Sequence, residues 1–192
     1  HRVLEEKLAG IVYLDILLEA EGDEPWLDPT LLQAAAHAEQ LALAEAAVQA
    51  VDSPLALLRE LRWVQRGGPS SDQPRDALPT TRREVASLLL LAEIAGQETL
   101  ATTHLSFDRR VLRITTRAAD VGAATYIQLE RRLRSSLEQS FAASPVRVRV
   151  QITGTSQVGY SGIDSLIKDL LRSLVWAFVL IFGTLVVLFR SL

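Results

Sequence analysis

Three residues in one short segment, His104, Ser106 and Asp108, have the side-chain types of a hydrolytic triad. They alternate along a run that is predicted to be a strand, so their side chains would project from one face of it. The side chains of a triad must converge on one point, and a row along a single strand rarely brings them together. The favoured interpretation is a polar strand that runs into a turn, and we predict no catalytic residue in this chain.

Metal and cofactor sites are not indicated either. The three histidines lack the i, i+4 spacing of zinc ligands on a helix; they are His1, His37 and His104. Gly154, Gly159 and Gly162 could suggest a loop that cradles a phosphate, but no lysine follows at the Walker spacing, and a linker is the better interpretation. The chain has no cysteine, which excludes disulfides and thiolate ligands. We therefore expect no metal and no cofactor.

The charge balance argues against nucleic acid as a partner. The formal net charge is −3, without the basic surplus that phosphate contacts need. Alternate arginines of two predicted strands could still form a basic stripe for an acidic headgroup or partner; they are Arg113, Arg117, Arg147 and Arg149. A solvated outer face of a sheet explains the same residues and is the favoured interpretation.

An apolar segment near the C-terminal end of the sequence predicts a transmembrane helix. Residues 174–189 read LVWAFVLIFGTLVVLF and carry no charge, with Arg172 and Arg190 on either side. At 1.5 Å per residue they span about 24 Å, close to the hydrocarbon thickness once the two leucines at 170–171 are added. We predict that Arg172 and Trp176 lie at the membrane interface beside the domain and that Arg190 lies at the opposite interface.

The residues that lead into this span, 161–173, predict an amphipathic link. Apolar residues recur there at helical spacing, and charged residues take the other positions. Lys168 and Arg172 precede the span and Arg190 follows it, which are too few charges to set the orientation by the positive-inside rule. The span itself holds no carboxylate, so no proton relay is predicted within it.

The part before the link reads as one soluble α+β domain over residues 1–160. A first strand alternates from Val12 to Glu19. Asp28 before Pro29 begins a helix, which we predict to continue to about Val51. Residues 52–98 are predicted to be an insertion or exposed loop that holds a short LLRELRWVQ segment, a Pro- and Gly-rich stretch and a helix ending at Gly96. The four consecutive leucines of that helix indicate heavy burial.

A hairpin, a helix and a strand complete the domain. Residues 100–107 and 111–118 alternate around a short turn and predict a β-hairpin. The helix that follows has one apolar stripe, formed by Tyr126, Leu129, Leu133, Leu137 and Phe141. After Pro145, residues 146–152 alternate valine or isoleucine with arginine or glutamine and form the clearest strand. This order predicts a ferredoxin-like split βαβ fold with a helical insertion, both main helices lying on one face of a four-stranded antiparallel sheet.

These features together resemble one region of the RND-superfamily exporters, in their MMPL-like, hydrophobe-exporting branch. The resemblance rests on VRVRVQITGTSQV after the split βαβ domain and on SLIKDLLRSLVWAFVLIFGTLVVLFRSL, which ends in Arg190, Ser191 and Leu192. It covers nearly the whole chain. Its motifs are not strict at individual positions, but their order along the chain is specific. The matching region of that family is the first porter domain outside the cytoplasm, followed by the second transmembrane helix.

The resemblance implies that this chain is part of a longer transporter in the bacterial inner membrane. The domain would be periplasmic, and residues 190–192 would face the cytoplasm. Export of hydrophobic or lipid-like cargo would be driven by protons through acidic residues outside this sequence. The implied partners are membrane lipids, the cargo and the remainder of the transporter chain, with a homo-oligomer left open and the cargo-binding residues unknown. A single-span, membrane-anchored domain that binds a ligand or a protein is the alternative, and a hydrolase built on Ser106 ranks last.

Overall fold

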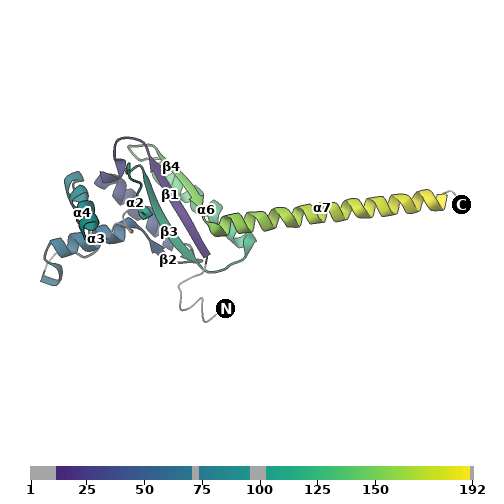
Figure 1. Cartoon of the computed structure of the whole chain (residues 1–192), viewed down its shortest axis with the longest axis horizontal. Coiled ribbons are helices and arrows are strands. Elements are labelled where there is room, and N and C mark those ends of the chain that lie inside the picture. Colours follow the sequence, from purple (N-terminus) through teal and green to yellow (C-terminus); the bar gives the residue numbers. More distant parts are fainter. Residues whose placement is uncertain (1–11, 71–73, 96–102, 191–192) are drawn as a thin grey trace.

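The computed structural model describes residues 12–70, 74–95 and 103–190, which form an α+β domain and one long projecting helix (Figure 1). The strands are β1 (Val12–Ala20), β2 (Val48–Asp52), β3 (Val111–Ala118) and β4 (Val148–Thr153). The helices within these ranges are α2 (Pro29–Leu43), α3 (Pro54–Gln65), α4 (Arg82–Ile94), α6 (Ala123–Phe141) and α7 (Thr155–Arg190), with short 3-10 helices η1 (Pro25–Leu27) and η2 (Gly68–Ser70). The strands form one antiparallel sheet in the order β2-β3-β1-β4.

The alternation read from the sequence is confirmed in the three longer strands. Leu14, Ile16 and Leu18 of β1 are fully buried, and the residues between them face the other side of the sheet. In β3 the same side holds Thr116, whose hydroxyl donates to the Leu14 carbonyl at 3.0 Å and is therefore satisfied within the core. β4 begins at Val148, two residues later than predicted.

The helices α2 and α6 pack against each other and on one face of the sheet, as predicted. Asp28 caps α2, because its side chain accepts the Thr30 amide at 2.8 Å. All five residues of the predicted stripe on α6 are buried, between 0% and 5% exposed. The opposite face of the sheet carries the polar side chains, which is the usual division of an antiparallel sheet.

The prediction that the first helix continues to about Val51 is wrong. α2 ends at Leu43, and Val48–Asp52 form the edge strand β2 against β3. The alanine-rich composition favours a helix there. Val48 nevertheless becomes 8% exposed and Val51 packs against the core when they pair with β3. Tertiary pairing thus overrides local propensity.

Residues 52–98, predicted to be an insertion or exposed loop, form two packed helices where the structure describes them, so the exposed-loop alternative is wrong. Ser53 caps α3 by accepting the Leu55 amide at 3.1 Å, and α3 packs against α4. Both helices send residues into the main core, namely Leu55, Leu58, Val85, Leu88 and Leu89. The proline and glycine residues between them therefore separate two packed helices.

The expectation of heavy burial for all four leucines of α4 is half right. Leu88 and Leu89 are buried, whereas Leu90 and Leu91 are 56% and 41% exposed. Four consecutive residues cover every face of a helix, and α4 packs against α3 and η1 on its inner side only. Gly96, where this helix was predicted to end, lies outside the described residues.

The predicted hairpin is present only in its second half. β3 forms as expected, but residues 103–104 are helical, and Leu105 makes a single bridge to Leu112. β1 and β2 occupy the two sides of β3, which leaves no full-length edge for a third neighbour. Positions 100–102 lie outside the described residues.

α7 follows β4 after one residue and continues unbroken to Arg190. The predicted linker at Gly154–Gly162 is therefore wrong: only Gly154 lies outside the helix, and the predicted link and span belong to one helix. The three glycines inside this helix, Gly159, Gly162 and Gly183, cost about 1 kcal/mol each relative to alanine, which a long helix tolerates. Gly154 has φ +147°, and an added Cβ would lie 2.7 Å from the Tyr13 carbonyl oxygen. Only glycine fits this junction.

Candidate functional site

The projecting part of α7 is the most distinctive surface of the described chain. The stretch Lys168–Val186 has a mean hydropathy of 1.8, and none of it is buried inside the protein. Its large apolar side chains are between 42% and 69% exposed, on all faces of the helix. An exposed helix that is apolar all round needs an apolar environment. This helix is long and apolar enough to cross a membrane.

The hydroxyl groups in this stretch make hydrogen bonds within the helix. Thr184 Oγ1 donates to the carbonyl of Leu180 at 2.6 Å and lies 2.9 Å from that of Ile181. Ser173 Oγ donates to the Leu170 carbonyl at 2.9 Å. Hydrocarbon offers no partner for a free hydroxyl, so these internal bonds suit both side chains to that environment.

The three predicted interface residues lie on α7 at the spacing of a bilayer. Arg172 and Arg190 are eighteen positions apart (190 − 172), or about 27 Å along a helix, against about 30 Å for the hydrocarbon layer. Trp176 is one turn from Arg172, and 64% of it is exposed. Their contact with headgroups remains a prediction.

Both chain connections of the domain leave from the same end of the sheet. The register pairs Asp15 near the start of β1 with Thr153 at the end of β4, and α7 contacts β1. The other end of the sheet carries the turn between β1 and η1 and the start of β3, on the far side of the domain from α7 (Figure 1). The domain therefore has a proximal end, next to α7, and a distal end.

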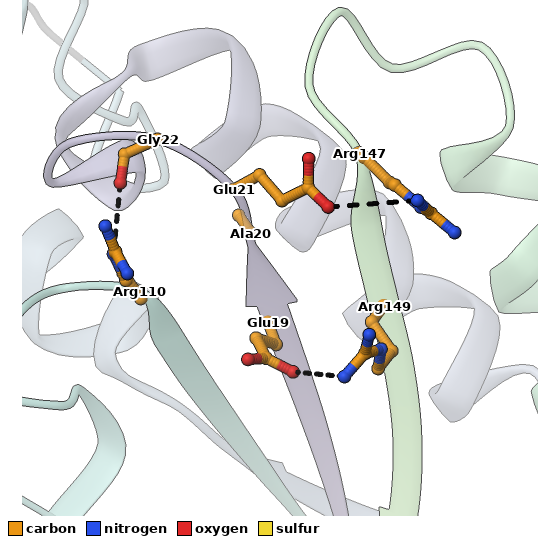
Figure 2. Close-up of a pocket in the computed structure, with 7 residues that line it drawn as sticks. All are labelled: Glu19, Ala20, Glu21, Gly22, Arg110, Arg147 and Arg149. Atoms are coloured by element: carbon orange, nitrogen blue, oxygen red, sulfur yellow. Dashed lines mark hydrogen bonds and ion pairs between the residues drawn. The ribbon is translucent and has the colours of Figure 1, made fainter.

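The predicted basic stripe is largely neutralised by carboxylates of β1 and the turn after it. Arg113 pairs with Asp15 at 2.7 Å, and Arg149 with Glu19 at 3.3 Å. Arg147 lies 3.9 Å from Glu21. The distal pairs line a hollow of about 240 Å³ in which the carboxylates stand between the guanidinium groups (Figure 2). These residues form a network of ion pairs on a solvated face of the sheet, which is the interpretation favoured from the sequence. Arg117 lies on the same face.

His104, Ser106 and Asp108 do not form a row along a strand. Ser106 Oγ donates to Asp108 at 2.6 Å and accepts the Val111 amide at 2.9 Å, which fastens the turn before β3. The Ser106 hydroxyl and then the Arg110 amide hold the pKa of Asp108 below its ordinary value. His104 instead bonds the Arg113 carbonyl. Across the described ranges, no group of three His, Asp or Glu side chains is placed to hold a metal ion.

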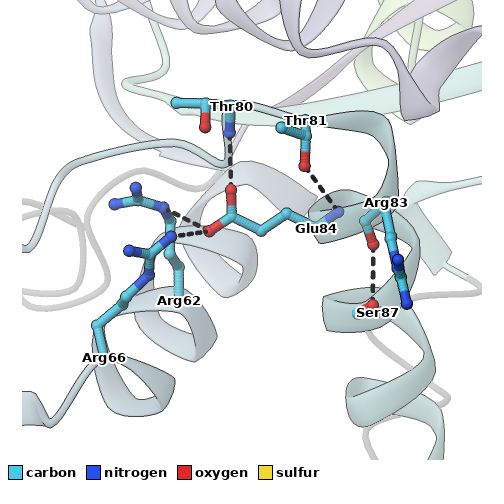
Figure 3. Close-up of polar contacts among 7 residues, drawn as sticks. All are labelled: Arg62, Arg66, Thr80, Thr81, Arg83, Glu84 and Ser87. Atoms are coloured by element: carbon cyan, nitrogen blue, oxygen red, sulfur yellow. Dashed lines mark hydrogen bonds and ion pairs between the residues drawn. The ribbon is translucent and has the colours of Figure 1, made fainter.

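A carboxylate that the sequence did not single out, Glu84, joins α3 to α4 (Figure 3). Its Oε1 accepts Arg62 Nε at 3.0 Å and Arg66 Nη2 at 3.1 Å, and its Oε2 accepts the Thr80 amide at 2.9 Å. Burial by itself raises the pKa of Glu84, but the Thr80 amide and the two guanidinium groups outweigh it, and the pKa lies below its ordinary value. The spacing of Thr81 and Glu84, a capping-box pattern, is the signal that could have found this residue.

The outward face of α4 is a second exposed apolar surface that sequence reasoning missed. Leu90, Leu91 and Ile94 are 56%, 41% and 74% exposed and follow one another at helical spacing. Phe107, at the distal turn, is fully exposed. The run of four leucines held the signal, because it makes α4 apolar on its outer as well as its inner side.

The sequence matches no protein-family model, and a search of curated proteins finds no relative.

Proposed function

We propose that this chain is the first periplasmic porter domain and the second transmembrane helix of a proton-driven, RND-type exporter of the MMPL-like branch. Its cargo is hydrophobic or lipid-like. The observation that carries the proposal is the passage from the last strand of an α+β domain, through one glycine, into an exposed helix that is apolar on all faces. A soluble protein would bury such a helix in its core.

The topology supports a ferredoxin-like porter fold. β1 and β2 both run antiparallel to β3, so they are parallel to each other with β3 inserted between them. β3 and β4 are related in the same way through β1. With α2 and α6 on one face, this order corresponds to a split βαβ arrangement with α3 and α4 as the insertion.

The position of the connections supports a domain held between two membrane segments. β1 starts at the end of the sheet from which α7 leaves, so a span before β1 and the span in α7 would both lie on the proximal side. In this proposal the domain lies outside the inner membrane on the periplasmic side, with Arg190 at the cytoplasmic interface. Arg172 and Trp176 would then contact lipid headgroups on the periplasmic side.

Mechanistically, the domain would move as α7 moves. The helix is continuous from Thr155, and Gly154 packs against the backbone of β1. A shift of the span therefore reaches the sheet without a flexible linker. Proton uptake by acidic residues elsewhere in the transporter would supply the energy, and this domain would open and close a groove for cargo.

The outward face of α4 is the surface that we assign to contact with the remainder of the same transporter chain. Leu90, Leu91 and Ile94 are exposed, and α4 lies on the opposite side of the domain from α7 (Figure 1), away from the bilayer. Such a patch is typical of a surface that another protein domain covers. A homo-oligomer would use the same kind of surface, whereas the net charge of −3 does not favour nucleic acid.

The test is transport by the full-length protein in proteoliposomes. A fluorescent lipid is placed in the cytoplasm-facing leaflet, and its export is measured with and without a proton gradient. Export that requires the gradient and is lost on replacing a mid-span carboxylate supports the proposal. A full-length protein without further spans would overturn it.

The alternative is a single-span anchored domain that binds a ligand or a protein. It is favoured by the fact that the described residues contain one candidate span. Protease protection of the full-length protein in sealed vesicles separates the two: several protected segments indicate a transporter, and one indicates an anchor.

A further inference from the structure

His104 is a buried imidazole at the point where the chain returns from α4 to the sheet. Its side chain is 5% exposed, and its Nδ1 lies 3.2 Å from the Arg113 carbonyl oxygen. Because a carbonyl can only accept, Nδ1 must carry the proton when the ring is neutral. The other nitrogen, Nε2, then presents its lone pair.

The group that faces Nε2 is the carboxylate of Asp52. Oδ2 of Asp52 lies 3.7 Å from Nε2, which is beyond hydrogen-bond distance but within the reach of an ion pair. In the neutral ring, two acceptors thus face each other. A proton on Nε2 changes this contact into a charge-assisted hydrogen bond after a small movement of Asp52, which is 58% exposed and can move.

The position of this pair gives it a structural consequence. Asp52 is the last residue of β2 and is followed by Ser53, the cap of α3. His104 precedes Leu105, which bridges to β3. The pair therefore joins the point where the chain leaves the sheet for α3 and α4 to the point where it returns.

The other carboxylates on the surrounding elements already have partners. On β3, Arg113 is held by Asp15 of β1 at 2.7 Å. On α2, Glu39 accepts the Ser53 hydroxyl and pairs with Arg59 of α3 at 2.9 Å. Asp52 is thus the carboxylate placed to respond to the charge of the ring.

We propose that His104 forms a proton-dependent contact with Asp52 that holds the base of α3 and α4. When Nε2 takes up a proton from solvent, it donates to Asp52 and ties the end of β2 to the residue before Leu105. When Nε2 is unprotonated, this tie is absent and the base of the two helices is less firmly held. The inference is independent of the transport proposal, because it requires only the folded domain.

The first experiment is ¹⁵N NMR of the histidine rings in the whole chain, held in nanodiscs. We expect His104 to be the Nδ1–H tautomer at alkaline pH and doubly protonated on acidification. Over the same pH range, hydrogen-exchange protection factors of Leu55 and Leu105 should rise by about two- to fivefold, the size expected for one partly exposed ion pair. The exposed His37, 2.9 Å from Ser140, is the internal reference.

The decisive variant is Asp52→Asn, with Asp23→Asn as the matched control at an exposed turn. In Asp52→Asn, the rise in protection of Leu55 and Leu105 should vanish, whereas the ¹⁵N spectrum of the His37 ring should be unchanged. Asp23→Asn should behave as the wild type. The proposal is wrong if Asp52→Asn keeps the full pH response, or if wild-type His104 is the Nε2–H tautomer at alkaline pH, a result that needs no variant at all.

Discussion

Replacing Glu84 by Gln should measure how much the contact between α3 and α4 contributes to the stability of the domain. Glutamine keeps the size and one acceptor oxygen but removes the charge that Arg62 needs. Arg62 has 7% of its side chain exposed and Glu84 13%, so this pair is shielded, whereas Arg66 is 47% exposed and counts for little. A hydrogen bond to a shielded charged group contributes about 1.5–3 kcal/mol, and we expect Glu84→Gln to lower the unfolding free energy by about 2 kcal/mol.

Urea unfolding of the whole chain in detergent measures this loss. The fluorescence of Trp26 and Trp63 reports on the domain, and Trp176 in the span gives a constant background. Glu60→Gln is the matched control, because Glu60 pairs with Arg75 where the side chains are 44% and 64% exposed; its loss should stay below about 1 kcal/mol. A double-mutant cycle with Arg62→Met should give a coupling of about 1.5 kcal/mol. Equal losses in Glu84→Gln and Glu60→Gln, with no coupling to Arg62, would refute the reasoning.

The remaining predictions concern pH, the junction, the span and the distal turn. Because the pKa of Glu84 is lowered in the fold, its stabilisation is complete above its ordinary pKa and is lost as pH falls through the lowered one; acid unfolding should therefore begin at higher pH in Arg62→Met than in the wild type. Gly154→Ala should cost about 2 kcal/mol in urea unfolding, because its φ is +147° and its Cβ would meet Tyr13, whereas Gly183→Ala, with open space around it, should cost nothing. Leu180→Arg should reduce membrane integration by about 3 kcal/mol in a glycosylation-mapping assay, and Leu43→Arg, outside the span, should leave it unchanged. Ser106→Ala should raise the pKa of Asp108 towards its ordinary value in a ¹³C NMR titration, since the Ser106 hydroxyl is the main cause of the lowering.

The periodic patterns of the sequence were sufficient where a single buried face decides the structure. The alternation of β1 and β3 and the stripe on α6 could be read directly, because each residue's side of the sheet follows from spacing alone. The edge strand β2 could not, since its five residues gain their conformation from β3 and their composition favours a helix. The packing of α3 also depended on contacts with distant residues, whereas the run of four leucines already held the signal of the apolar outer face of α4.

In the candidate site, too, local features could be predicted from the sequence and long-range contacts could not. The apolar character of α7 is a local property, and the sequence was enough to predict it. The partners of Arg113 and Glu84 are distant in sequence and could be found only in the folded chain. The turn role of Ser106 was hidden because a strand was predicted there.

In the proposed membrane arrangement, α7 is unbroken between the sheet and the bilayer, so the number of residues in 155–167 decides the direction in which the domain faces. Thirteen positions separate Thr155 from Lys168 (168 − 155), or about 20 Å of helix, and each residue turns the chain by about 100°. Deleting one residue would therefore lower the domain by about 1.5 Å and also rotate it by more than a quarter turn about the membrane normal. Seven-residue changes would nearly restore its facing, whereas changes of two or five would point α4 elsewhere. The length of this stretch should therefore vary among functional forms of the protein in steps that preserve helical phase.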